Sequence, residues 1–207
     1  GTMFHTRRFL NYHPQYRFQD HSLYFQKKEK RHAIFPAASV KAKNGDILHS
    51  HPGATIGSFV TKTSSSLKES FDLVTALVKY AQDENFSGIK ITLPPNCYSE
   101  PTSNYIEFAL LKIGFTYLKR EVSSVMLLPG TIEETMKGFK PSHRQAVRKA
   151  EKEGVQIRQS TNFGTFYRIL KNNLSKRHGV SPTHSLKELE LLQAIFPNRI
   201  ILHGAFI

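Results

Sequence analysis

Cysteine and long apolar stretches are what this sequence lacks. Its 207 residues include one cysteine, Cys97, which excludes an internal disulfide and a zinc site built from several thiolates. No apolar run approaches the roughly 20 residues that a membrane-spanning helix requires, and no apolar signal segment follows the first basic residues. These absences predict a cytoplasmic protein without a transmembrane segment, and they leave peripheral contact with a membrane surface open.

Acidic residues are scarce relative to basic ones. The chain has 16 Asp and Glu against 29 Lys and Arg, a formal net charge of +13. Such a field favours anionic partners, such as nucleic acid, nucleotide-linked sugars, coenzyme phosphates or acidic membranes. Hydrophobic residues make up 39% of the chain, enough to bury a core. We therefore expect a folded protein with an excess of positive charge.

The first part of the chain alternates strand patterns with two helices. The stronger helix begins at a capping box formed by Ser66 and Glu69. A second helix is predicted over residues 103–113, closed by Gly114. The side chains expected on the buried face of the first helix are Leu67, Phe71, Val74, Val78 and Ala81. The strand patterns occupy residues 22–26, 33–41, 89–93 and 115–128.

The pattern changes at Pro129 and Gly130, so we predict one domain over residues 1–128 and a second over 129–207. Capping-box patterns occur at Thr131, Ser142 and Ser185. Further elements are strands over 155–159 and 199–207 and a helix from Phe163 that ends at Gly179. Because no later strand could pair with the apolar strand 199–207, we expect the second domain to be incomplete.

Five short stretches carry a family resemblance. They are residues 5–10 (HTRRFL), 50–57 (SHPGATIG), 109–115 (ALLKIGF), 144–155 (RQAVRKAEKEGV) and 167–180 (YRILKNNLSKRHGV). Together they resemble segments of the GNAT-fold acyltransferases related to the Fem peptidoglycan aminoacyl transferases. The resemblance implies an α/β (α+β) fold, in which a GNAT-like mixed sheet flanked by helices is followed by a truncated second GNAT-like half.

The resemblance also implies an activity. Fem-type enzymes take an aminoacyl group from aminoacyl-tRNA and transfer it to a peptidoglycan precursor. We therefore expect an acyl or aminoacyl transferase that acts on an amine of a cell-envelope or polysaccharide precursor, with acyl-CoA or aminoacyl-tRNA as donor and no tightly bound cofactor. Residues 1–207 alone would lack full activity. His51, Thr55 and Ser58 would line the substrate cleft between the two halves.

One segment departs from the GNAT pattern. GNAT acetyltransferases hold the coenzyme A pyrophosphate with a glycine-containing loop before the central helix, whereas residues 61–66 (TKTSSS) contain no glycine. The usual mode of coenzyme A binding is therefore not expected. Free amides at the helix start, together with Lys62 and Ser64, could still attract a phosphate. Plain N-capping by Ser66 explains the same residues.

Most of the positive charge lies in residues 137–178, which hold eleven Lys and Arg against two Glu. Arg144 and Arg148 are four residues apart and share one face of a predicted helix. Guanidinium groups suit bidentate contact with phosphate. We therefore predict that Arg144, Arg148 and Arg177 bind phosphates of an anionic or nucleotide-linked substrate. A solvated helix face is the alternative interpretation.

The residues by themselves leave the chemistry open. No pair of nucleophile and base stands out, so the catalytic residues are unknown. His49 and His51 lack the third ligand of a metal site, and no metal is expected. A non-catalytic module that binds tRNA, and not DNA, also explains the charge, and its affinity would fall steeply with salt. A scaffold that keeps the fold without the chemistry is a third interpretation.

Overall fold

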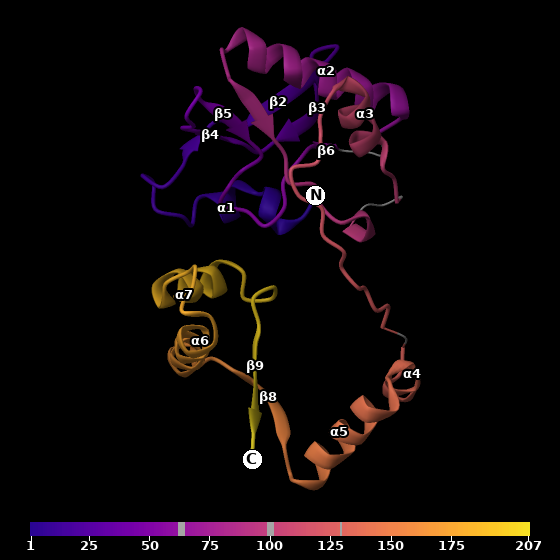
Figure 1. The fold of residues 1–207 in the computed structure, drawn as a ribbon, viewed down its shortest axis with the longest axis vertical. Coiled ribbons are helices and arrows are strands. Elements are labelled where there is room, and N and C mark those ends of the chain that lie inside the picture. Colours follow the sequence, from indigo (N-terminus) through magenta and orange to yellow (C-terminus); the bar gives the residue numbers. More distant parts are fainter. Residues whose placement is uncertain (62–64, 99–101, 129) are drawn as a thin grey trace. The chain divides into compact units, whose positions relative to one another are not determined.

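The computed structural model describes residues 1–61, 65–98, 102–128 and 130–207 (Figure 1). The chain divides into two compact units, Gly1–Leu118 and Lys119–Ile207, and each is described here by itself. The predicted domain boundary between residues 128 and 129 falls within the second unit.

The larger sheet of the first unit is mixed. Its strands, in spatial order, are β1 (Gln19–Asp20), β4 (Ala38–Val40), β5 (Ile47–His49) and β7 (Gly88–Lys90). β4 pairs antiparallel with both β1 and β5, while β5 pairs parallel with β7. The turn between β4 and β5 places Gly45 at a φ of 115°, which favours glycine. The mixed sheet confirms the predicted fold class.

A smaller antiparallel sheet consists of β2 (Leu23–Lys27), β3 (Lys30–Phe35) and β6 (Val60–Thr61). The tight turn between β2 and β3 places Lys28 and Glu29 at positive φ. The strand predicted over residues 33–41 is in fact two strands, β3 and β4, which lie in different sheets. Pro36 separates them, because a proline has no amide with which to continue a ladder.

Helix α2 (Leu67–Asp83) begins as predicted. Ser66 Oγ accepts from the Glu69 amide at 3.2 Å, and the Glu69 carboxylate accepts from the Ser66 amide at 3.1 Å. These bonds and Lys27 hold the pKa of Glu69 down at about 2. The predicted buried face was partly wrong, because Leu67 is 41% exposed. The buried side chains are Ser70, Leu73, Val74, Leu77 and Ala81.

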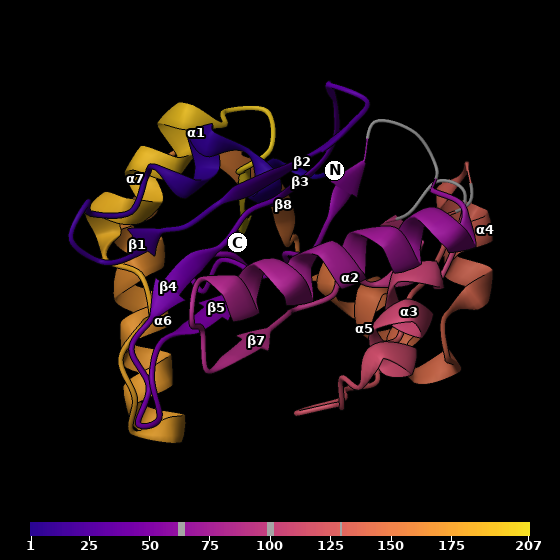
Figure 2. The same ribbon diagram turned by 90° about the horizontal axis from the view of Figure 1, so that it is seen from above.

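The core of the first unit lies between α2 and the strands. Phe35, Ala37 and Leu48 pack there against Leu77 and Ala81 of α2. On its other flank α2 packs beside α3 (Tyr105–Ile113) through a cluster of Val74, Ala109 and Leu110 (Figure 2). Gly114 ends α3 in the left-handed conformation, as predicted. Between β7 and α3 lies the short 3₁₀ turn η2 (Asn96–Tyr98).

The strand predicted over residues 115–128 is absent. This stretch pairs with no described strand, and its apolar side chains are exposed, with Leu118 at 81%, Val122 at 101% and Leu127 at 87%. The apolar pattern is typical of a strand, but a strand forms only where a neighbour accepts its backbone hydrogen bonds. Such a neighbour is missing from the described residues.

The described residues of the second unit form four helices and two strands. These are α4 (Ile132–Gly138), α5 (Pro141–Lys152), β8 (Gln156–Ser160), α6 (Phe163–His178), α7 (Leu186–Ile195) and β9 (Leu202–Phe206). Thr131 and Ser185 cap α4 and α7 as predicted. The capping box predicted at Ser142 is wrong, because α5 already begins at Pro141. A proline suits the first helical position, where its missing amide is not needed.

Strand β9 is not unpaired. It runs antiparallel to β8, with Gln156 opposite Phe206 and Ser160 opposite Leu202. We looked for a partner only in a later strand, whereas β8 precedes β9 in the chain. That the second domain is incomplete stays a prediction. Among the described residues no helix combines the length and apolar character needed to cross a membrane.

Candidate functional site

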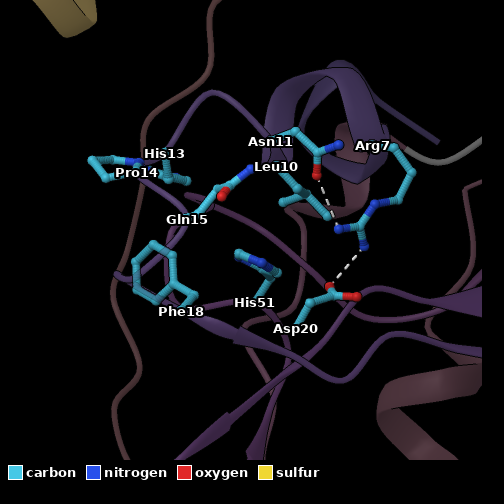
Figure 3. A pocket seen from close by; sticks show the side chains of 9 residues that line it. All are labelled: Arg7, Leu10, Asn11, His13, Pro14, Gln15, Phe18, Asp20 and His51. Atoms are coloured by element: carbon cyan, nitrogen blue, oxygen red, sulfur yellow. Dashed lines mark hydrogen bonds and ion pairs between the residues drawn. The ribbon is translucent and has the colours of Figure 1, made fainter.

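A pocket of about 260 Å³ lies in the first unit, beside the short helix α1 (Arg7–Leu10) (Figure 3). Its walls come from α1, from the irregular segment that follows α1, from the end of β1 and from the loop after β5. The lining residues are Arg7, Leu10, Asn11, His13, Pro14, Gln15, Phe18, Asp20 and His51.

The N-terminal segment is fastened to the loop after β5. A 3₁₀ turn, η1 (Met3–His5), leads into α1, and Thr6 Oγ1 accepts from the Phe9 amide at 3.2 Å. The buried His5 ring accepts from the Thr2 amide through Nδ1 and donates through Nε2 to the Gly57 carbonyl at 3.0 Å. These bonds hold α1 against the loop that carries His51.

Arg7 organises the polar side of the pocket. Its Nη1 donates to Asp20 Oδ1 at 2.7 Å and to Ser22 Oγ at 2.9 Å, and its Nη2 donates to Asn11 Oδ1 at 3.1 Å. Burial alone would raise the pKa of Asp20, but the hydrogen bonds from Arg7 and Ser22 bring it below its usual value. The guanidinium and the carboxylate therefore stay charged and paired.

Aromatic rings form the opposite side. The rings of His13 and Phe18 lie 4.9 Å apart at 86°, and those of Phe18 and His51 lie 5.3 Å apart at 72°. His13 Nε2 donates to the Gly53 carbonyl at 2.8 Å. A Cβ at Gly53 would collide with both His13 and Phe18. Glycine at this position therefore allows the loop to approach the rings closely.

His51 is the most deeply buried of the titratable groups in the pocket, with 3% of its surface exposed. Burial is the main reason that its pKa falls to about 4; Asp20 opposes the shift, while His13, Arg7 and His49 add to it. Its Nδ1 accepts from the Gly53 amide at 3.4 Å, so the proton of the neutral ring lies on Nε2. That Nε2–H makes no hydrogen bond to any described residue.

The structure separates the three loop residues that we predicted to bind substrate. His51 lines the pocket, whereas Thr55 is exposed and Ser58 is buried with a φ of 81°, and neither of these two lines it. Their proposed role in substrate binding stays a prediction.

The predicted phosphate-binding arginines also lie in different settings. Arg144 donates to the carbonyl oxygens of Phe139 at 3.0 Å and Lys137 at 3.4 Å, so it closes the C-terminal end of α4. Arg148 on α5 and Arg177 in the last turn of α6 are exposed, and neither makes a hydrogen bond or ion pair with a described residue. Lys62 and Ser64 lie outside the described residues.

The polar half of the pocket was not predicted. Arg7, Asn11 and Asp20 come from a segment whose sequence shows no periodicity; Arg7 lies in the stretch 5–10 that carries the family resemblance, whereas no motif distinguishes Asn11 and Asp20 from other surface residues. Their grouping depends on how residues 4–20 fold against the loop after β5. In the part of the chain that the structure describes, no three His, Cys, Asp or Glu side chains gather as a metal site would require.

Similarity to known proteins is visible in structure alone. No family model and no curated protein matches the chain. A crystal structure of FemX superposes with a TM-score of 0.60 over 94% of this chain, at 15% sequence identity. The chain has a Fem-like fold. It spans 50% of the length of FemX.

A crystal structure of wild-type TTHA1254 from Thermus thermophilus matches 54% of this chain and 73% of its own length, at 22% identity and a TM-score of 0.34. The Fem-like fold agrees with the resemblance seen in the sequence. The GNAT assignment and the division into two GNAT-like halves stay predictions.

Proposed function

We propose that this protein takes part in transferring an acyl or aminoacyl group to an amine of a cell-envelope or polysaccharide precursor, as Fem-type enzymes do. The observation that carries the proposal is the Fem-like fold, shared with FemX over 94% of the chain. The five stretches of sequence that resemble Fem-related transferases point to the same activity.

In such a transfer the protein mainly holds donor and acceptor in line for attack. The pocket beside α1 would hold part of the acceptor, and the exposed guanidinium groups of Arg148 and Arg177 would contact phosphates of the donor or of a nucleotide-linked acceptor. Cations or amides near the carbonyl would stabilise the oxyanion. Arg144 has a smaller share in this scheme, because it already binds the carbonyl groups of Lys137 in α4 and of Phe139 just after it.

The direct test is an acyl-transfer assay. The chain is incubated with radiolabelled aminoacyl-tRNA or acyl-CoA and with nucleotide-linked amino sugars or muropeptides, and products are separated by chromatography. Because the chain spans half of FemX, we expect slow transfer, together with donor or acceptor binding that NMR detects. Absence of both transfer and binding, for every donor and acceptor, would overturn the proposal.

A second candidate function is tRNA binding without catalysis. It is favoured by α5, which has no buried residue and exposes Arg148 and Lys152. Binding carried by phosphate contacts weakens with salt, with a slope of log K against log salt of about −0.7 to −0.9 per contact. We expect such a slope in a filter-binding titration with uncharged tRNA, and no binding at low salt would remove this candidate.

A pair of charge reversals separates specific contact from general attraction. Arg148→Glu should weaken tRNA binding at least tenfold, whereas Lys43→Glu, an equal change at an exposed lysine of the first unit, should have a small effect. Equal losses in both variants would show that only the net charge matters. Binding of tRNA without any transfer would favour the second candidate over the first.

A further inference from the structure

The pocket beside α1 has two chemically different walls. Figure 3 shows Arg7, Asn11 and Asp20 on one side, the rings of His13, Pro14 and Phe18 on the other, and Gln15 and His51 between them. The first side is the polar wall, and the second is the ring wall. A ligand that fits both walls must present polar groups along one edge and apolar C–H groups on a face.

The pocket carries no net charge. The Arg7 guanidinium is paired with the Asp20 carboxylate at 2.7 Å, and a buried neutral His51 adds nothing to the sum. Because these two charges cancel, this side of the pocket gives neither an anion nor a cation a net attraction, and the geometry favours a neutral ligand.

Two of the groups that the pocket presents to a ligand are an acceptor on Asp20 and a donor on His51. Asp20 Oδ1 accepts from both Arg7 and Ser22, while its Oδ2 accepts no hydrogen bond from a described residue. The His51 Nε2–H is the donor. A carboxylate oxygen only accepts and this N–H only donates, whereas a hydroxyl group does both. Neighbouring hydroxyl groups therefore match this wall.

The ring geometry argues against a nucleobase. A flat base held between two parallel rings needs about 7 Å between them, two contacts of about 3.5 Å. The parallel His13 and His51 rings have centroids only 6.4 Å apart, and Phe18 stands nearly edge-on to both. A saturated ring needs only one aromatic surface, because its polarised C–H groups contact the negative face of the π-system.

We propose that this pocket binds one neutral pyranose ring, with its hydroxyl groups on Asp20 and His51 and its C–H face on Phe18. The volume of about 260 Å³ suits a single ring, since sites for larger ligands run from about 300 to 1,000 Å³. The assignment of this ring to the acceptor precursor rests on the proposed function. The binding of a pyranose ring in the pocket is independent of the proposed function.

Saturation-transfer NMR with methyl glucopyranoside, methyl galactopyranoside and N-acetylglucosamine tests the proposal. A ligand of this size should bind with a Kd on the order of 1 mM. Phe18→Ala and Asp20→Asn should each weaken binding at least tenfold. The matched controls are Tyr16→Ala, an exposed ring next to the pocket that does not line it, and Asp72→Asn, an exposed carboxylate on α2; both should bind as the unaltered chain does.

Each outcome decides the matter. The proposal is supported if a pyranose binds the unaltered chain and both controls but not the two pocket variants. If Phe18→Ala unfolds the protein, Phe18→Leu replaces it as the pocket variant. Failure of every pyranose to bind, or a preference for adenosine, inorganic phosphate or glucosamine, overturns it. Acyl transfer without sugar binding at this pocket would support the proposed function and overturn the pyranose site. Sugar binding without acyl transfer would support the pyranose site and not the proposed function.

Discussion

The two units of this chain differ in how they use their residues. The first unit encloses a core in which Phe35, Val74 and Leu77 have no exposed surface, whereas the second unit buries only Phe163 and Leu192 among its described apolar side chains. The second unit instead carries most of the excess positive charge. The first unit therefore holds most of the buried packing, while the second presents a more exposed and more basic surface.

The largest expected effect tests the contrast in packing. Leu77→Ala should lower the free energy of unfolding by about 4 kcal/mol, because a fully buried leucine leaves a cavity. Leu192→Ala, at 6% exposure in the second unit, should cost about 2 kcal/mol, near the lower end of the same range. Urea denaturation followed by circular dichroism measures both, and equal losses would contradict the contrast.

The buried His51 should make the stability of the first unit depend on pH. Its pKa falls from 6.5 in the unfolded chain to about 4 in the fold, so the unfolded chain binds more protons between these values. Stability should therefore fall by about 3 kcal/mol as the pH drops from 6.5 to 4. His51→Gln should remove most of this slope in urea titrations at several pH values, leaving the smaller contributions of His5 and His49, whose pKa values burial also lowers.

Stability should be nearly as sensitive to a substitution at Gly53, where the loop approaches two rings closely. Gly53→Ala would push a methyl group into His13 and Phe18, and overpacking of this kind costs about 1 to 3 kcal/mol. It should also abolish ligand binding in the pocket. Gly88→Ala, where an added Cβ meets open space, is the control and should change neither quantity.

The smallest expected change in stability comes from removing one helix cap in each unit. Ser66→Ala and Thr131→Ala each remove a hydroxyl that accepts an amide at 3.2 Å, a change that costs about 1 kcal/mol. Because α2 packs on a core and α4 buries no residue, Ser66→Ala should shift the main unfolding transition. Thr131→Ala should change only the helical signal before that transition.

Local signals in the sequence were sufficient for most helices and for the hairpins. The caps at Ser66, Thr131 and Ser185, and the glycines at 114 and 179, act within one helical turn, so their patterns predict structure directly. The errors came where a distant neighbour decides the outcome. Residues 115–128 have the apolar pattern of a strand but no described partner, and β9 proved to pair with β8.

The sequence by itself determined the α/β class, the helix ends and the charge concentrated in residues 137–178, because each depends on residue type and short spacing. Only the tertiary structure decided which residues share the pocket. Arg7, Asp20 and His51 are brought together by hydrogen bonds from His5 to the loop after β5 and from Arg7 to β1. Arg144 binds the carbonyl groups of Lys137 and Phe139 at the end of α4 instead of lying free on a helix face. Contacts between distant segments leave no periodic trace in the chain, since they arise only when the backbone folds them together.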